Sequence, residues 1–105
     1  MQYNAAISSV DELKTLTHLL RKDGFDVTKG LPEYYRKKKI VGICIDPDKN
    51  KVYGVNSMIM ACLCSVRRNP VYYKDIMDNY DRLIKEKNFD YYLEIIEKRR
   101  NAKNA

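Results

Sequence analysis

Residues 40–45 constrain the fold of this chain more than any other segment. Their sequence, Ile-Val-Gly-Ile-Cys-Ile, lacks the polar alternation of a strand that has one face in solvent. Such a run predicts a central β-strand that is covered on both faces of its sheet. Residues 46–50, Asp-Pro-Asp-Lys-Asn, predict a turn. We therefore expect residues 52–55 to return as the partner strand of a hairpin.

The N-terminal third predicts a helix over residues 10–23. Ser9 and Glu12 match the capping box, in which the two side chains satisfy backbone N–H groups at the start of a helix. Gly24 supplies the left-handed residue that commonly ends a helix. Apolar residues recur at helical spacing and form one stripe: Val10, Leu13, Leu16 and Leu20. Residues 2–8 and 25–28 are candidates for short strands.

Residues 58–66 form a second run that is apolar on every side. We favour a helix over residues 57–67, because Met, Ala and Leu are good helix formers, although a strand remains an alternative. Such a helix has to be buried on most of its sides. Its cysteines, Cys62 and Cys64, are then expected to be buried, reduced and free of metal.

The C-terminal third predicts two further helices. Asn69 and Pro70 are suited to the cap and the first position of a helix that extends to about residue 87. Its apolar stripe consists of Tyr73, Ile76, Met77, Tyr80, Leu83 and Ile84. A last helix begins near Phe89 and fades into a polar tail over residues 101–105.

These elements predict an α+β fold with a small, mainly antiparallel sheet. The sheet is expected to pack with one N-terminal helix and with a C-terminal bundle of two to three helices. Residues 1–100 are interpreted as a single domain, which is the usual size for a chain of 105 residues. We see no signal peptide and no apolar run of the ~20 residues that span a membrane, so a cytoplasmic location without membrane contact is expected.

The sequence offers little for catalysis or metal binding. Cys62 and Cys64 are two residues apart, and on a helix such residues point to different sides and cannot share one ion. The only histidine, His18, lies off the apolar stripe of the first helix and has no obvious carboxylate partner. We therefore predict no metal ligands, no cofactor and no catalytic residues. An enzyme whose site the sequence does not reveal remains the less favoured alternative.

A cluster of cations and aromatic side chains precedes the central strand. Cations can neutralise phosphates, and tyrosine rings can stack on bases. On a chain with a formal net charge of +6, this cluster predicts contact with nucleic acid or a nucleoprotein. Its residues are Tyr34, Tyr35, Arg36, Lys37, Lys38 and Lys39. A solvated loop is the alternative interpretation. Other cations extend the site only if they share its face: Arg21, Lys22, Lys49, Lys51, Arg67, Arg68 and residues 98–100.

The alternative function is that of a protein-interaction module or inhibitor. Tyr72 and Tyr91 lie off the apolar stripes of the last helices and are expected to face outward. Tyrosine is favoured at interfaces because it offers a large contact area at a low cost in entropy. A small basic regulator or inhibitor from a mobile element fits this size and composition.

Overall fold

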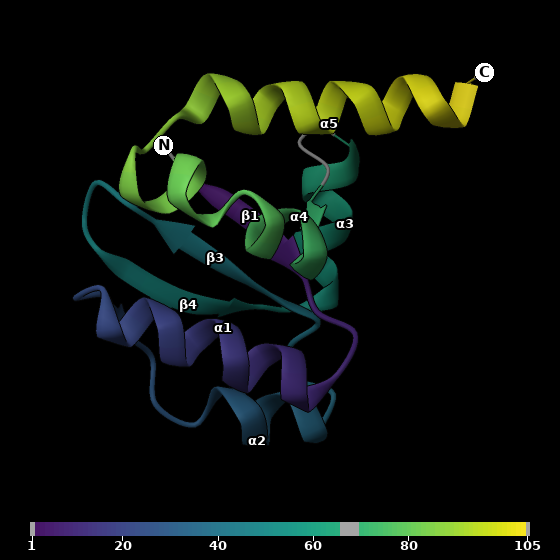
Figure 1. The fold of residues 1–105 in the computed structure, drawn as a ribbon. Coiled ribbons are helices and arrows are strands. Elements are labelled where there is room, and N and C mark those ends of the chain that lie inside the picture. The colour runs from purple at the N-terminus through teal and green to yellow at the C-terminus, as the bar shows by residue number, and fades with distance from the viewer. Residues whose placement is uncertain (1, 66–69, 105) are drawn as a thin grey trace.

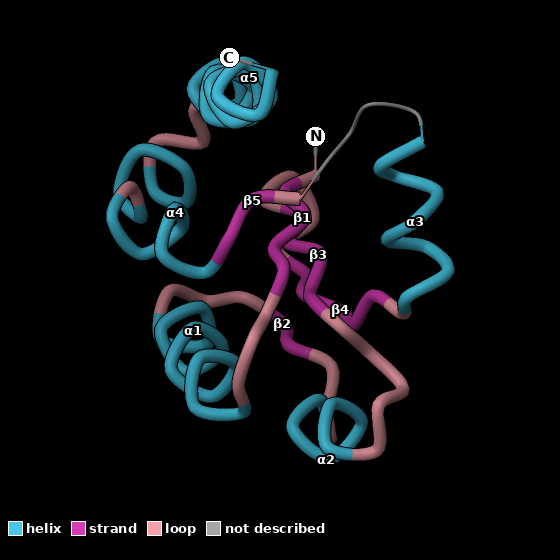
Figure 2. Tube along the Cα trace, turned by 90° about the vertical axis from the view of Figure 1, so that its right-hand side faces the viewer, coloured by secondary structure: helices cyan, strands magenta, loops and turns pink. Residues whose placement is uncertain are grey.

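Strand β3 (Gly42–Asp46) is the middle strand of a five-stranded sheet, and all five of its residues are buried, as the sequence predicted. The computed structural model describes residues 2–65 and 70–104. Helices α1 and α4 lie on one side of the sheet, and α3 lies on the other (Figure 2).

The elements follow one another along the chain in an order that mixes strands and helices (Figure 1). They are β1 (Tyr3–Ala6), α1 (Val10–Lys22), β2 (Asp26–Val27), α2 (Leu31–Arg36), β3, β4 (Lys51–Val55), α3 (Ser57–Ser65), β5 (Val71–Tyr72), α4 (Tyr73–Asp78), the π-helical turn η1 (Asp81–Lys85) and α5 (Phe89–Asn104).

The sheet is mixed, so the prediction of a mainly antiparallel sheet was only partly right. Its strand order is β2-β4-β3-β1-β5. The three inner strands pair antiparallel, whereas β2 joins β4 and β5 joins β1 in parallel. Both parallel strands are edge strands of two residues. Segments this short have no periodic pattern from which their direction can be deduced.

The predicted hairpin is confirmed. Strands β3 and β4 pair from Gly42 with Val55 to Asp46 with Lys51. The Asp46 carboxylate stabilises the turn by accepting hydrogen bonds from the backbone N–H groups of Asp48 (3.1 Å) and Lys49 (3.2 Å).

Helix α1 also agrees with the sequence prediction. The backbone N–H of Glu12 donates to Ser9 Oγ at 3.2 Å. The Glu12 carboxylate reaches one residue further back than the capping box requires, because it accepts from the backbone N–H of Ser8 at 3.0 Å. Gly24 has φ +90° after the end of the helix. The backbone N–H of Phe25 then donates to the Leu20 carbonyl at 3.0 Å, which completes the helix-ending motif.

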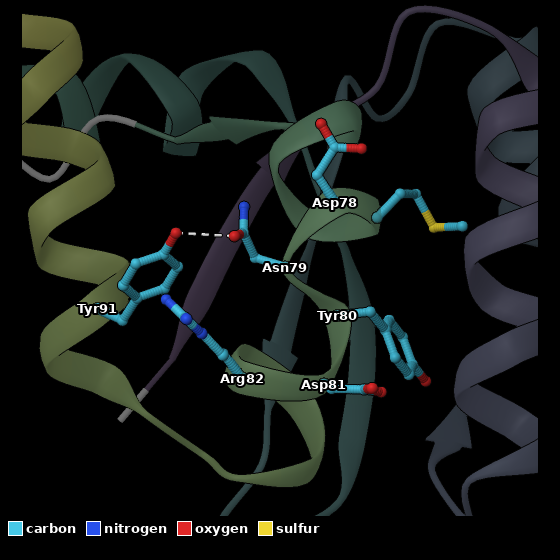
Figure 3. A pocket seen from close by; sticks show the side chains of 7 residues that line it. Asp78, Asn79, Tyr80, Asp81, Arg82 and Tyr91 are labelled. Atoms are coloured by element: carbon cyan, nitrogen blue, oxygen red, sulfur yellow. Dashed lines mark hydrogen bonds between the residues drawn. The ribbon is translucent and has the colours of Figure 1, made fainter.

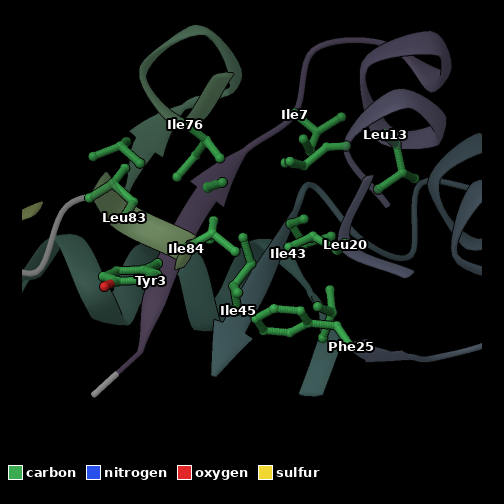
Figure 4. Packing of buried hydrophobic residues seen from close by; sticks show 14 of the residues in the cluster. Tyr3, Ile7, Leu13, Leu20, Phe25, Ile43, Ile45, Ile76, Leu83 and Ile84 are labelled. Atoms are coloured by element: carbon green, nitrogen blue, oxygen red, sulfur yellow. The ribbon is translucent and has the colours of Figure 1, made fainter. Parts of the chain in front are cut away.

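Three helical elements bury their apolar residues on one face of the sheet (Figure 4). Helix α1 contributes Leu13, Leu16 and Leu20, and α4 with η1 contributes Ile76, Leu83 and Ile84. Helix α5 covers the core near Tyr3, at the end of β1 that lies beside the turn between β3 and β4. There Tyr92 packs against Tyr3, and its hydroxyl accepts a hydrogen bond from the backbone N–H of Asn4 at 3.0 Å.

The prediction for Pro70 was wrong. Pro70 is not helical, and the two residues after it form β5 instead of the first turn of a helix. Helix α4 begins only at Tyr73 and ends at Asp78, after which η1 follows. Asn69 lies outside the described residues. Pairing of Val71 with Ala5 at the sheet edge outweighs the local preference for a helix.

Residues 57–65 form the predicted helix α3, but its predicted burial was wrong. Met58 is 74% exposed and Ile59 is 48% exposed, and Cys62 is exposed as well. Residues 66 and 67 lie outside the described part of the chain, and the side chain of Cys64 is not described. At the C-terminus, α5 continues to Asn104, through residues that were expected to form a polar tail.

Candidate functional site

The predicted basic and aromatic cluster forms the last turn of α2 and the motif that ends it. Lys38 has φ +59°, the left-handed conformation that glycine usually provides at this position. The backbone N–H of Lys38 donates to the Tyr35 carbonyl at 3.0 Å, and that of Lys39 donates to the Tyr34 carbonyl at 2.9 Å. These two bonds are those of the Schellman motif. The cations are therefore displayed by a hydrogen-bonded turn and not by an irregular loop.

The two tyrosines of the cluster have different environments. Tyr35 is half-buried against the core, and its hydroxyl donates to the Ile7 carbonyl at 3.3 Å. Tyr34 is 42% exposed, and its ring lies beside Gly30, near the start of the same helix. Tyr34 is therefore the ring that a ligand can reach, whereas Tyr35 anchors α2 to the body of the protein.

All four cations of the cluster are exposed. The Lys37 ammonium lies 3.2 Å from the Glu33 carboxylate, in a pair whose side chains are both more than half exposed. Exposed pairs of this kind contribute between about 0 and 1 kcal/mol. Lys37 is therefore not held strongly and remains available to an anionic ligand.

The described cations that the sequence analysis named as possible extensions of this site lie elsewhere in the fold. The cluster precedes β3, whereas Lys49 and Lys51 lie at the far end of that strand, in the hairpin turn and at the start of β4. Residues 21–22 end α1. A few residues later, the backbone N–H of Asp26 donates to the Asn50 carbonyl of this same turn at 2.8 Å, so the end of α1 lies near it. Lys98 and Arg99 are on α5, at the opposite end of both views from α2 (Figures 1 and 2). Arg67 and Arg68 lie outside the described residues. The cluster before β3 is therefore separate from the cations of the hairpin and of α5.

Tyr72 and Tyr91 take part in contacts that hold α5 against α4. The Tyr91 hydroxyl donates to Asn79 Oδ1 at 2.8 Å, and the Arg82 guanidinium lies 5.0 Å from its ring centre. Tyr72 is half exposed, and the guanidinium of Arg99 lies 4.4 Å from its ring centre. The same guanidinium pairs with the Asp75 carboxylate at 2.6 Å. Intramolecular packing accounts for much of the surface of both rings.

A hollow of about 540 Å³ lies at the junction of α4 and η1, lined by residues 77–82 and by Tyr91 of α5 (Figure 3). Several of its polar groups already have partners within the chain. The Tyr80 hydroxyl donates to Asp23 at 2.5 Å, and Asp81 lies 3.7 Å from the Lys85 ammonium. We assign no ligand to this hollow.

The described residues offer no arrangement typical of catalysis. His18 is exposed on α1. Cys44 is buried, and burial raises the pKa of its thiol, which keeps the sulfur protonated and unreactive at neutral pH. Within residues 2–65 and 70–104, no three His, Cys, Asp or Glu side chains are grouped so that they could hold a metal ion.

The outward face of α3 is the surface that sequence reasoning missed. The available signal was the run of apolar residues itself, which we interpreted as a sign of burial. A helix that is apolar all round indicates either burial or an interface, and only the structure distinguishes the two. None of the described helices is both long and apolar enough to cross a bilayer. No family model, curated protein or solved structure matches this chain.

Proposed function

We propose that this protein is a non-enzymatic, macromolecule-binding protein that engages nucleic acid or a nucleoprotein through residues 34–39. The proposal is carried by one observation. The exposed ring of Tyr34 and the exposed cations of residues 36–39 belong to one hydrogen-bonded turn. Such a turn presents a stacking surface and several positive charges together, and it loses little conformational entropy on binding.

Lys37, Lys38 and their neighbouring cations bind phosphates by releasing the counterions that surround nucleic acid. Tyr34 supplies the stacking contact with a base or a sugar. Since the cations of the hairpin and of α5 lie at separate places, we expect a short footprint of three or four phosphates. Binding is then weak, steeply dependent on salt, and largely independent of sequence, because backbone contacts do not distinguish bases.

The test is a salt titration of fluorescence anisotropy with single- and double-stranded oligonucleotides. Three or four phosphate contacts give a slope of log K against log salt of about −2 to −4. Reversing Lys37 and Lys38 to Glu should flatten the slope by roughly two contacts' worth. Reversing Lys49 and Lys51 introduces the same change of charge at the hairpin and should leave the slope nearly unchanged.

The contribution of stacking is tested separately at Tyr34. Tyr34→Ala should weaken binding by about 1–3 kcal/mol with the slope unchanged, and Tyr34→Phe should retain most of the affinity. The proposal fails if wild-type protein does not bind at low salt. It also fails if the variants at the hairpin and at residues 37 and 38 lose affinity equally, because net charge alone then explains the binding.

Protein interaction through the tyrosines of the C-terminal helices remains our second proposal. The exposure of Tyr72 and of Leu93 on α5 favours it, since both are about half exposed. Tyr72→Ala and Tyr91→Ala should then abolish partner binding, and circular dichroism has to show that the domain stays folded, because Tyr91→Ala also removes the hydrogen bond to Asn79. The proposal loses support if the wild-type protein purifies with nucleic acid and without any protein partner.

A further inference from the structure

The ring of Tyr34 lies back along α2, over the residue that precedes the helix. Side chains of a helix tilt towards its N-terminus and cover the turn before their own Cα. The backbone N–H of Tyr34 donates to the Gly30 carbonyl at 3.0 Å, and a Cβ added at Gly30 would lie 3.6 Å from Cε2 of the ring. The exposed ring is therefore near the start of α2, whereas the cations at residues 37–39 follow its end.

A further cation lies at the end of α2 that this ring approaches. Lys29 directly precedes Gly30 and is exposed. Helix α2 has six residues and is about 9 Å long, so Lys29 and residues 37–39 mark the two ends of a short segment that carries the ring. Sequence reasoning left Lys29 out of the cluster because the helix separates it from the other cations along the chain.

A ring with cations on both sides matches the chemistry of one strand of nucleic acid, in which phosphates flank each base. A base can stack on a tyrosine ring only when it is unpaired and unstacked, because both of its faces are covered inside a duplex. Cations alone favour a duplex, since its more closely spaced phosphates release more counterions per contact. Tyr34 therefore supplies a preference for unpaired bases that the cations do not have.

Helix α2 is poorly placed to enter the major groove of a duplex. That groove is about 12 Å wide and admits one helix, whereas α1 lies alongside α2 (Figures 1 and 2). Leu31 is buried, and the Tyr35 hydroxyl donates to the Ile7 carbonyl at 3.3 Å, so both residues anchor α2 to the body of the protein. A duplex would therefore meet the cations without using the ring of Tyr34.

We propose that residues 29 and 34–39 bind a single strand of DNA or RNA, a proposal that rests on the function above and narrows it to unpaired strands. One base stacks on Tyr34. The phosphates on its two sides contact Lys29 at one end of α2 and Lys37 or Lys38 at the other. DNA and RNA offer the same phosphates and comparable base faces, so both kinds of strand are compared in the test.

The first test compares probes on the wild-type protein by fluorescence anisotropy at equal phosphate concentration. They are a strand of about 12 deoxythymidines, its duplex with deoxyadenosines, an abasic strand of the same length and a uridine strand. The thymidine strand should bind about 5- to 150-fold more tightly than the abasic strand, as expected for one stacked base. It should also bind more tightly than the duplex. This preference should grow with salt, because the duplex loses affinity with the steeper slope.

The second test asks whether Tyr34 causes the preference. Tyr34→Ala should weaken binding of the thymidine strand by the same factor and leave the abasic strand and the duplex within about twofold of wild type. Unchanged binding of the abasic strand also shows that the variant is folded. Tyr34→Phe should keep the preference. Tyr53→Ala removes a ring of similar exposure on β4, 40% against 42%, and should keep the preference as well.

The third test concerns Lys29. Lys29→Gln should flatten the slope of log K against log salt for the thymidine strand by about 0.7, which corresponds to one lost phosphate contact. Lys49→Gln removes the same charge in the hairpin turn and should leave the slope unchanged.

The outcomes separate the single-strand site from the function on which it rests. A wild-type protein that binds none of the probes at low salt overturns both. A duplex or abasic strand that binds as tightly as the thymidine strand leaves nucleic-acid binding in place but overturns the preference for unpaired strands. A preference that persists in Tyr34→Ala overturns stacking on this ring. An unchanged slope in Lys29→Gln removes Lys29 from the site.

Discussion

Tyr3 and Tyr92 pack ring against ring beneath α5, with ring centroids 4.9 Å apart and ring planes tilted by 54°. Their hydroxyl groups differ. That of Tyr92 accepts a hydrogen bond from the backbone N–H of Asn4, at a point where the edge of β1 has no further strand beside it. That of Tyr3 is buried and has no hydrogen-bond partner among the described residues. The same substitution in each ring should therefore have opposite consequences.

Tyr92→Phe should destabilise the fold. The variant keeps the ring but removes the acceptor for the Asn4 N–H, and a buried donor without a partner costs about 1–3 kcal/mol. Urea unfolding measures the loss as a lower midpoint with an unchanged slope. Tyr34→Phe is the control, because Tyr34 is exposed, and its free energy of unfolding should change little. An unfolding midpoint equal to wild type would show that this hydrogen bond is not important for stability.

Tyr3→Phe should leave stability at neutral pH within about 1 kcal/mol of wild type or raise it. Removing a buried hydroxyl that lacks a partner leaves no group unsatisfied and relieves a desolvation cost. The ring contacts with Phe89 and Tyr92 are retained. The measurement is again urea unfolding, side by side with Tyr92→Phe. If Tyr3→Phe is as damaging as Tyr92→Phe, the Tyr3 hydroxyl has a partner in solution.

Alkaline pH should destabilise the protein. Burial, together with the nearby charge of Asp48, raises the pKa of Tyr3 to about 12, whereas an unfolded tyrosine titrates near about 10. Between these values the unfolded state binds fewer protons, so the free energy of unfolding falls as pH rises. Tyr53, whose pKa is raised to about 12 by its hydrogen bond with Cys44 and by burial, contributes in the same direction.

The size of this effect is about 2–3 kcal/mol for Tyr3 by pH ~12, and the stabilising contribution is fully present below pH ~10. Unfolding free energies measured across this range should fall less steeply in Tyr3→Phe than in wild type. Tyrosinate absorbance provides an independent readout, since late-titrating groups should ionise together with unfolding. Identical slopes for variant and wild type would rule out Tyr3 as a source of the pH dependence.

Lys38→Gly should stabilise the fold and weaken nucleic-acid binding at the same time. Lys38 occupies a left-handed position, and a non-glycine residue pays about 1 kcal/mol there. Glycine removes that cost but also removes one phosphate contact, which should flatten the salt slope by somewhat less than one unit. Thermal unfolding and anisotropy measure the two effects. Binding that is unchanged in the more stable variant would argue against residues 34–39 as the site.

Gly42→Ala should be strongly destabilising, by about 3 kcal/mol. An added Cβ would lie 2.3 Å from the carbonyl oxygen of Ala5, a backbone atom of the neighbouring strand that cannot move without disturbing the pairing. Gly24→Ala is the informative comparison. No atom approaches within 4 Å there, so only its φ of +90° opposes the substitution, and a cost of about 1–2 kcal/mol is expected. Equal costs at both positions would contradict the close contact at Gly42.

The sequence alone determined the central part of this fold. Residues 40–45 and the turn after them specified β3 and its hairpin. An apolar run without alternating polar residues and an Asp-Pro turn are both set by residues that are close together in the sequence. The caps at Ser9 and Gly24 specified the ends of α1 for the same reason. Of the candidate site, the sequence identified the cations and tyrosines of residues 34–39, but not that Tyr35 is anchored while Tyr34 is exposed.

Tertiary structure decided what depends on distant neighbours. Residues 71–72 became a strand because Ala5 offers them a sheet edge, an interaction across more than sixty positions that overrides the local signal of Pro70. Whether α3 is buried depends on how much of its surface the rest of the chain can cover. An apolar pattern indicates that a surface avoids water, but it does not indicate whether the same chain or a second molecule covers that surface.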